Sequence, residues 1–214
     1  MIILASGSPR RQELMRQAGF EFAVRPAEVD ETNTDPSPAK RVEELSARKA
    51  KHVYESSREI EDCIVIGSDT LVASGETILG KPKDRDEAIG MIRRIAGTTH
   101  EVHTGVTVMW REDGKDRSCT WSETTEVEVY PMTDEEIASY ADSSEPYDKA
   151  GGYGIQGAFA VYVKGIRGDY NNVVGLPLAS LWQKMKQLGL LKKVMAERFD
   201  ADRCIGFKQV DVDR

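Results

Sequence analysis

Cysteine is scarce in this chain of 214 residues, which contains only Cys63, Cys119 and Cys204. An odd number of widely spaced cysteines argues against a disulfide framework or a zinc site and favours reduced thiols. Long hydrophobic runs are also absent, and no basic segment precedes the short apolar run at the N-terminus. Neither a membrane span nor a secretory signal is predicted. We therefore expect a cytoplasmic protein that does not bind a membrane.

A surplus of basic residues is absent as well. The chain has 29 Lys and Arg against 36 Asp and Glu, which gives a net charge of −7. Binding to a nucleic acid polymer depends on basic residues that release counterions from phosphates, so we expect no such partner. A local basic cluster can still bind a small anion. The sequence also has no P-loop and no His-Glu-x-x-His motif, which argues against a standard P-loop NTPase or a metalloprotease.

The remaining composition is typical of a folded α/β protein. Hydrophobic residues make up 40% and charged residues 30% of the chain, without repeats or low-complexity tracts. A chain of this length is expected to form one large α/β domain or a two-lobed unit. Hydrophobic periodicity predicts strands at residues 2–5, 21–25, 64–67, 102–110, 119–129 and 159–163. It predicts helices at residues 12–18, 38–59, 85–96, 133–141 and 177–188, the fourth opened by a capping box of Thr133 and Glu136. The Asp113-Gly114 turn predicts a hairpin of the strands 102–110 and 119–129, and Ser74-Gly75 is a further hairpin signal.

The first predicted strand is followed at once by the segment Ser6-Gly7-Ser8-Pro9-Arg10-Arg11. A turn from a buried strand into a helix leaves backbone N–H groups unpaired, and four side chains add donors around them. These side chains are Ser6, Ser8, Arg10 and Arg11. Such a pocket suits a phosphate group. An ordinary strand-to-helix turn with two solvated arginines is the alternative that this segment alone leaves open.

Two charged residues fall in apolar surroundings. Lys49 shares one helix face with Val42 and Val53, so its ammonium must reach solvent, pair with a carboxylate or meet a bound anion. Asp69 follows the apolar strand 64–67, so we expect it at a strand end, where clefts form. A carboxylate there is either a satisfied structural group, or a metal ligand or general base.

Two apparent motifs are rejected on their context. The segment Gly152–Gly157 matches the dinucleotide-binding pattern G-x-G-x-x-G, but it follows a polar loop and precedes a β-rich run. It is either a loop that lets the backbone and Gln156 approach a ligand, or a plain glycine-rich turn. His100 and His103 would point to opposite faces of a strand, so we assign them no catalytic role.

Taken together, nine segments resemble the Maf family of nucleoside triphosphate pyrophosphatases. They are Ser6–Arg11, Val29–Thr32, Lys49, Gly67–Thr70, Gly80–Pro82, Glu145–Pro146, Lys149–Gly151, Gly154–Gly157 and Val174–Pro177. The resemblance implies an elongated mixed β-sheet with flanking helices and two lobes around a central cleft, as in the inosine triphosphate pyrophosphatases. It also implies a homodimer. Residues 1–190 would form this single two-lobed domain, and residues 191–214 a charged tail that we expect to be poorly ordered.

Three positions match the branch of that family that hydrolyses dTTP and UTP: Arg10, Thr70 and Gln156. The branch that acts on 7-methyl-GTP carries Trp, Gln and Glu at these places. The amide of Gln156 can pair with a neutral pyrimidine edge, whereas a carboxylate suits a cationic methylguanine better. We therefore expect dTTP and UTP as substrates, with CTP or modified pyrimidine nucleotides as further candidates.

The resemblance implies metal-assisted attack of water on the α-phosphorus, which releases a nucleoside monophosphate and pyrophosphate. Asp69 would be the general base or a metal ligand, Glu31 its companion on a magnesium or manganese ion, and Lys49 and Lys81 the catalytic cations. The substrate-binding residues would be Ser6, Ser8, Arg10, Arg11, Thr70, Lys149 and Gln156. Two alternatives stay open: a nucleotide-binding regulator of cell division without essential turnover, and a base-tolerant house-cleaning enzyme.

Overall fold

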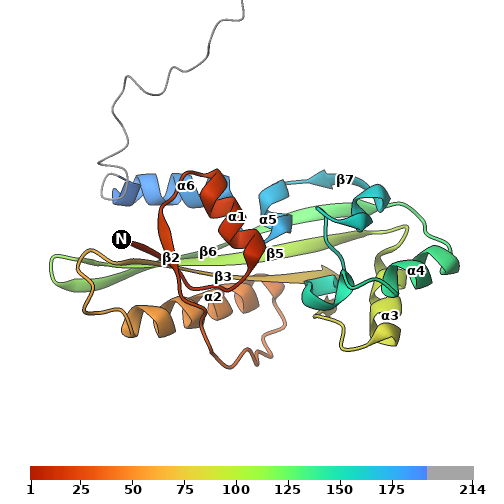
Figure 1. Cartoon of the computed structure of the whole chain (residues 1–214), viewed down its shortest axis with the longest axis horizontal. Coiled ribbons are helices and arrows are strands. Elements are labelled where there is room, and N and C mark those ends of the chain that lie inside the picture. Colours follow the sequence, from red (N-terminus) through yellow and green to blue (C-terminus); the bar gives the residue numbers. More distant parts are fainter. Residues whose placement is uncertain (192–214) are drawn as a thin grey trace, which may run out of the picture.

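A computed structural model describes residues 1–191, which form one mixed sheet of seven strands with helices packed around it (Figure 1). The strand order is β2-β1-β3-β5-β6-β7, and β4 pairs with β3 outside this path. The pairs β1–β2 and β1–β3 are parallel, and the remaining pairs are antiparallel. The strands are β1 (Ile2–Leu4), β2 (Phe22–Val24), β3 (Ile64–Ser74), β4 (Thr77–Leu79), β5 (Thr99–Glu112), β6 (Lys115–Val129) and β7 (Val163–Arg167).

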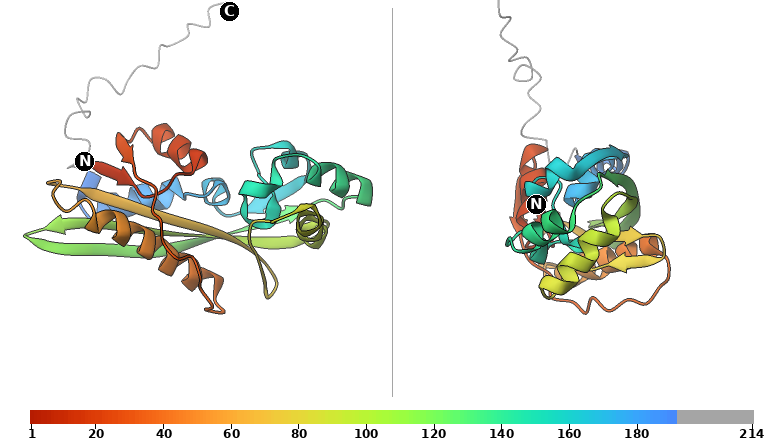
Figure 2. Two further views of the ribbon diagram at one scale, coloured as in Figure 1. Left: turned by 60° about the horizontal axis from the view of Figure 1, so that its bottom comes forward. Right: turned by 90° about the vertical axis from the view of Figure 1, so that its right-hand side faces the viewer.

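The helices cover both faces of this sheet and its far end (Figures 1 and 2). They are α1 (Pro9–Gln17), α2 (Pro38–Glu55), α3 (Arg85–Ile95), α4 (Asp134–Ala141), α5 (Tyr170–Val174) and α6 (Leu178–Gln187). Helix α2 packs on one face of the sheet, and α1 and α6 pack on the other. Helices α3 and α4 lie at the end of the sheet that is farthest from the turn between β5 and β6. The expected elongated mixed sheet with flanking helices is confirmed.

The apolar core is divided along the length of the sheet. Strand side chains alternate between faces, so Ile64 and Ile66 pack with α1 and α6 at one end. Farther along the same face, Val72 packs with Ile92 of α3 and Ile137 of α4. Strand β3 therefore passes through both apolar clusters, and the polar residues between them lie near the middle of the molecule.

Two glycines let helix α2 lie directly on the sheet. A Cβ at Gly67 of β3 would collide with the carbonyl oxygen of Ser46, and a Cβ at Gly105 of β5 with that of Val42. Only glycine allows the helix backbone this close to the strands. The close packing brings Lys49 of α2 over the strand residues that follow Gly67.

Two strand predictions are wrong. Strand β3 does not end at Gly67, because it pairs with β5 from Ile64 to Ala73, so Asp69 lies within a strand. Gly67 accommodates the contact with α2 and does not end the strand. Residues Ala158–Tyr162 form a 3-10 helix, and β7 begins only at Val163. The apolar residues in that segment reflect the packing of Phe159 against three tyrosine rings.

Several other predictions from the sequence agree with the structure. The β5–β6 hairpin and the capping box of Thr133 and Glu136 are confirmed. Helix α1 begins at Pro9, earlier than predicted, because proline fits the first helical turn. The hairpin signal at Ser74-Gly75 is confirmed by the antiparallel pairing of β3 with β4, whereas the short helix α5 was not predicted. The domain boundary near residue 190 stays a prediction, and nearly all of the expected tail lies outside the described residues.

The close approach of α2 to the sheet generates a stability prediction. Gly105→Ala should lower the free energy of unfolding by about 3 kcal/mol, because the added methyl group meets helix backbone that cannot move aside alone. Gly90→Ala is the matched control, since its methyl group enters open space within α3 and should raise stability by about 0.5–1 kcal/mol. Chemical denaturation measures both. A Gly105→Ala protein as stable as wild type would contradict this packing.

Candidate functional site

A cavity of about 650 Å³ opens where one edge of β3 has no neighbouring strand. Strand β1 pairs only with Ile64–Ile66, and β4 only with Val72–Ser74. Within the described part of the chain, no strand lies beside Gly67–Leu71 on this edge. The turn after β1, the loop after β4 and the segment between α4 and β7 line the cavity, which is large enough for a small-molecule ligand. We call it the cleft.

Neighbouring residues of β3 reach the cleft from opposite faces of the sheet. Asp69 points toward the face covered by α2, and Thr70 toward the face covered by α1 and α5, as strand alternation requires. The open edge makes both side chains accessible to one ligand. Had another strand continued along this edge, that access would be lost.

The ammonium group of Lys49 lies between two carboxylates. Its Nζ is 2.6 Å from Oδ1 of Asp69 and 2.6 Å from Oε1 of Glu31. Lys49 and Asp69 are 8% and 9% exposed, so this ion pair is largely shielded from water. The hydrogen bond from Lys49 lowers the pKa of Glu31. Of the alternatives left open by the sequence, the structure shows Lys49 paired with carboxylates.

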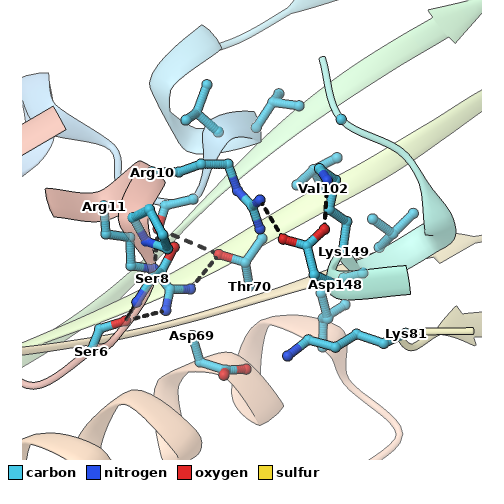
Figure 3. Close-up of a pocket in the computed structure, with 18 of the residues that line it drawn as sticks. Ser6, Ser8, Arg10, Arg11, Asp69, Thr70, Lys81, Val102, Asp148 and Lys149 are labelled. Atoms are coloured by element: carbon cyan, nitrogen blue, oxygen red, sulfur yellow. Dashed lines mark hydrogen bonds and ion pairs between the residues drawn. The ribbon is translucent and has the colours of Figure 1, made fainter. Parts of the chain in front are cut away.

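The guanidinium of Arg11 is fixed by three oxygens (Figure 3). Its Nε donates to the carbonyl of Gly175 at 2.8 Å, Nη1 to Oγ of Ser6 at 3.1 Å, and Nη2 to Oγ1 of Thr70 at 3.0 Å. Burial lowers the pKa of Arg11, and the negative charge of Asp69 opposes that shift. Of the five N–H donors of Arg11, two have no partner among residues 1–191 and can meet a ligand.

Arg10 spans the cleft to the opposite wall. Its Nη1 lies 2.9 Å from Oδ2 of Asp148, whose Oδ1 is 2.5 Å from Nζ of Lys149 (Figure 3). Lys149 also donates to the carbonyl of Glu145 at 2.7 Å. Arg10 and Lys149, two of the three cations predicted to bind substrate, therefore share one carboxylate, Asp148, which the sequence reasoning missed.

The remaining predicted residues also lie at the cleft. Ser8 is the N-cap residue of α1, and its backbone N–H donates to Oγ of Ser6 at 3.3 Å. Lys81 and Gln156 line the cleft and make no hydrogen bond or ion pair within residues 1–191. All the residues that the sequence singled out as candidates for catalysis, substrate or metal are thus brought to one cavity. Their individual roles stay predictions.

The glycine-rich loop is held by a carboxylate that the sequence reasoning did not single out for chemistry. Glu145 accepts hydrogen bonds from the hydroxyl of Tyr140 at 2.9 Å and from the N–H of Ala158 at 2.8 Å. A Cβ at Gly157 would collide with that carboxylate, so a larger residue there would displace the Glu145 side chain from the loop. This contact positions the loop that carries Gln156.

The histidines lie apart from this chemistry. His100 contacts the hydroxyl of Tyr153 at 2.7 Å, and burial lowers its pKa to about 4. His103 contacts Thr124 and Glu101. No cluster of three or more His, Cys, Asp or Glu side chains that could hold a metal occurs among the described residues.

The charge of the cleft is opposite to that of the chain. Five cations line it, against three carboxylates, so the local balance is positive although the chain carries a net charge of −7. The cations are Arg10, Arg11, Lys49, Lys81 and Lys149, and the carboxylates are Glu31, Asp69 and Asp148. Together, the fold and this cleft are typical of proteins that bind a small anionic ligand, such as a phosphorylated molecule, at the open edge of a mixed sheet.

Comparison with known proteins identifies the family. Residues 1–188 match the family model described as Maf-like protein, so the chain belongs to the Maf family. It is 48% identical over 200 residues to a dTTP/UTP pyrophosphatase of Agathobacter rectalis, covering 88% of this chain and 98% of that protein. It is 46% identical to proteins of the same name from Lachnoclostridium phytofermentans and Bacillus cereus. Both matches cover 88% of this chain, and they cover 95% of the first relative and 96% of the second.

The buried ion pair generates a stability prediction. Lys49→Met should lower the free energy of unfolding by about 3 kcal/mol, because it leaves the carboxylate of Asp69 buried without its cation. Lys49→Met combined with Asp69→Asn should recover much of this loss, since the buried group that remains is neutral and the carboxylate of Glu31 is exposed to water. Lys51→Met, at an exposed position of α2, is the control and should change stability by less than about 0.5 kcal/mol. Additive effects of the two changes in denaturation experiments would contradict the pairing.

Proposed function

We propose that the cleft binds a nucleoside triphosphate and hydrolyses it between the α- and β-phosphates, releasing a nucleoside monophosphate and pyrophosphate. The expected substrates are dTTP and UTP, with CTP or modified pyrimidine nucleotides as further candidates. The relatives named dTTP/UTP pyrophosphatase support this substrate class, since the match extends over nearly their whole length. The observation that carries the proposal is the group formed by Lys49, Asp69 and Glu31 at the open edge of β3.

The proposed roles follow from the chemistry of each side chain. Phosphoryl transfer depends mainly on positioning and on neutralisation of charge, which cations and hydroxyl groups supply. Lys49 and Lys81 neutralise the phosphates, and Asp69 orients the attacking water or accepts its proton. The side chains that would hold the substrate are Ser6, Ser8, Arg10, Arg11, Thr70, Lys149 and Gln156.

A divalent cation, magnesium or manganese, is part of this proposal. Glu31 and Asp69 each use one carboxylate oxygen on Lys49, and the second oxygen of each has no partner among the described residues. Hard oxygen donors of this kind suit magnesium, which commonly takes one or two protein carboxylates and completes its shell with water and substrate phosphates. When bound, such an ion neutralises phosphate charge and activates water. Glu31 and Asp69 are the residues that would hold it.

We also propose a cytoplasmic homodimer that binds neither a membrane nor a nucleic acid polymer. The family resemblance supports the dimer. The odd number of widely spaced cysteines supports the location, and the acidic balance supports the absence of a nucleic acid partner. None of the helices in residues 1–191 has the length and hydrophobicity needed to cross a bilayer.

One substrate panel separates this activity from its alternatives. Purified protein is incubated with magnesium and dTTP, UTP, CTP, 7-methyl-GTP or ITP, and pyrophosphate and orthophosphate are detected separately. We expect pyrophosphate from dTTP and UTP. Similar rates with all five nucleotides would indicate a base-tolerant house-cleaning enzyme, and nucleotide binding without pyrophosphate release would indicate a regulator of cell division.

Asp69→Asn tests the proposed catalytic carboxylate. We expect turnover of UTP to fall at least 10²-fold, because the amide can neither accept the proton of water nor bind a metal as a carboxylate does. UTP binding should stay largely intact, as measured by calorimetry. Asp86→Asn, at an exposed position in the first turn of α3, is the control and should keep wild-type turnover. Near-normal turnover by Asp69→Asn would refute the assigned role.

A further inference from the structure

Thr104 of β5 is a fully buried hydroxyl residue directly opposite Thr70 of β3. Its Oγ1 lies 2.9 Å from the carbonyl oxygen of Asn172 and 3.0 Å from Oγ1 of Thr70. A carbonyl oxygen can only accept a hydrogen bond, so Thr104 donates its single hydroxyl proton to Asn172. Toward Thr70, Thr104 can therefore only accept.

The hydroxyl proton of Thr70 consequently has one good acceptor. The other oxygen nearby is the carbonyl of Gly175 at 3.5 Å, which already accepts from Nε of Arg11 at 2.8 Å and from Oγ of Ser68 at 3.2 Å. Both lone pairs of that carbonyl are in use. Thr70 thus donates to Thr104 and accepts from Nη2 of Arg11 at 3.0 Å.

The Asn172 carbonyl that sets this direction is itself held in place. The side chain of Asn172 donates to the carbonyl of Val102 and to Oγ1 of Thr125, each at 2.9 Å, and Asn172 is fully buried. Thr125 also donates to the carbonyl of Asp169, the N-cap residue of α5. The backbone of α5 cannot easily turn its carbonyl away from Thr104.

Thr70 therefore presents the cleft with a hydrogen-bond acceptor and no donor. One lone pair takes the proton of Arg11, and the other is left for a ligand. An ionised phosphate oxygen, which also only accepts, gains nothing from this group. A ligand N–H does gain, and uracil and thymine share one at the N3 position, where cytosine has a bare ring nitrogen that accepts.

We propose that Thr104 is a positioning residue that fixes the Thr70 hydroxyl as an acceptor, and that Thr70 thereby selects the imide N–H of uracil and thymine over cytosine. This inference rests on the proposed function and places CTP below UTP among its substrates. A polar group aimed at a donor discriminates strongly against an analogue that presents an acceptor, because two lone pairs then face each other.

The test compares kcat/KM for UTP and CTP in wild type and in Thr104→Val, which keeps the shape of the side chain but removes its hydroxyl. The wild type should prefer UTP. In Thr104→Val the Thr70 hydroxyl is free to turn and donate to cytosine, so the UTP:CTP ratio should fall about tenfold, mainly through KM. Thr104→Ser, which keeps the hydroxyl, should retain the wild-type ratio.

Thr70→Val shows whether Thr104 acts through Thr70. It should also lower the ratio, and adding Thr104→Val to it should have no further effect on selectivity. Three results would each overturn the inference. The first is a wild type that does not prefer UTP, and the second is a UTP:CTP ratio that Thr104→Val leaves unchanged. The third is a fall in the ratio on adding Thr104→Val to Thr70→Val that is as large as the fall in the wild-type background. Thermal unfolding checks that each variant is folded, and Thr104→Cys, whose thiol is a weak donor and acceptor, replaces Thr104→Val where that variant does not fold.

Failure of the proposed function gives a different result. If the folded wild type releases no pyrophosphate from UTP, the proposed hydrolysis is refuted. The selectivity inference is then tested with the dissociation constants of UTP and CTP. The same tenfold fall in the ratio for Thr104→Val is then expected in calorimetry. Equal dissociation constants for the two nucleotides in the wild type would overturn the inference.

Discussion

The contact of Lys49 with the buried Asp69 and the exposed Glu31 is the interaction on which the site depends. An ammonium group this far from water needs a paired charge, and the pairing joins helix α2, strand β3 and the loop before α2 at one point. The two glycines under α2 make the contact possible, since a side chain at either position would lift the helix from the sheet. The gap between β1 and β4 then opens the same point to a ligand.

Two polar networks meet at this opening from the two faces of the sheet. On the α2 face, charged groups dominate and suit phosphates and a metal ion. On the other face, Arg11 is fixed by hydroxyl and carbonyl oxygens, and the direction of each hydrogen bond follows from a backbone carbonyl that can only accept. In the proposed function, the charge on one face would bind the triphosphate, and the hydrogen-bond direction on the other face would distinguish the bases.

Local patterns in the sequence predicted much of the fold, whereas several of the candidate cleft residues, such as Lys81 and Lys149, were singled out only through the family resemblance. Helical periodicity located α2, and the Asp113-Gly114 turn located the β5–β6 hairpin. The extent of β3 could not be predicted, because Gly67 resembles a strand end until its contact with α2 is known. Thr104 and Asp148 gave no local signal, since a threonine in a strand is ordinary and the ion pair of Asp148 joins residues 138 positions apart.

The central claim is that one triphosphate lies across both networks, and a crystal structure of the protein with magnesium and a UTP analogue that carries an α,β-imido bridge tests it directly. The account predicts the phosphates beside Arg11, Lys49 and Lys81, a metal ion on Glu31 and Asp69, and the uracil imide facing Thr70. A nucleotide bound outside the cleft, or one whose phosphates do not approach Lys49 and Asp69, would contradict it.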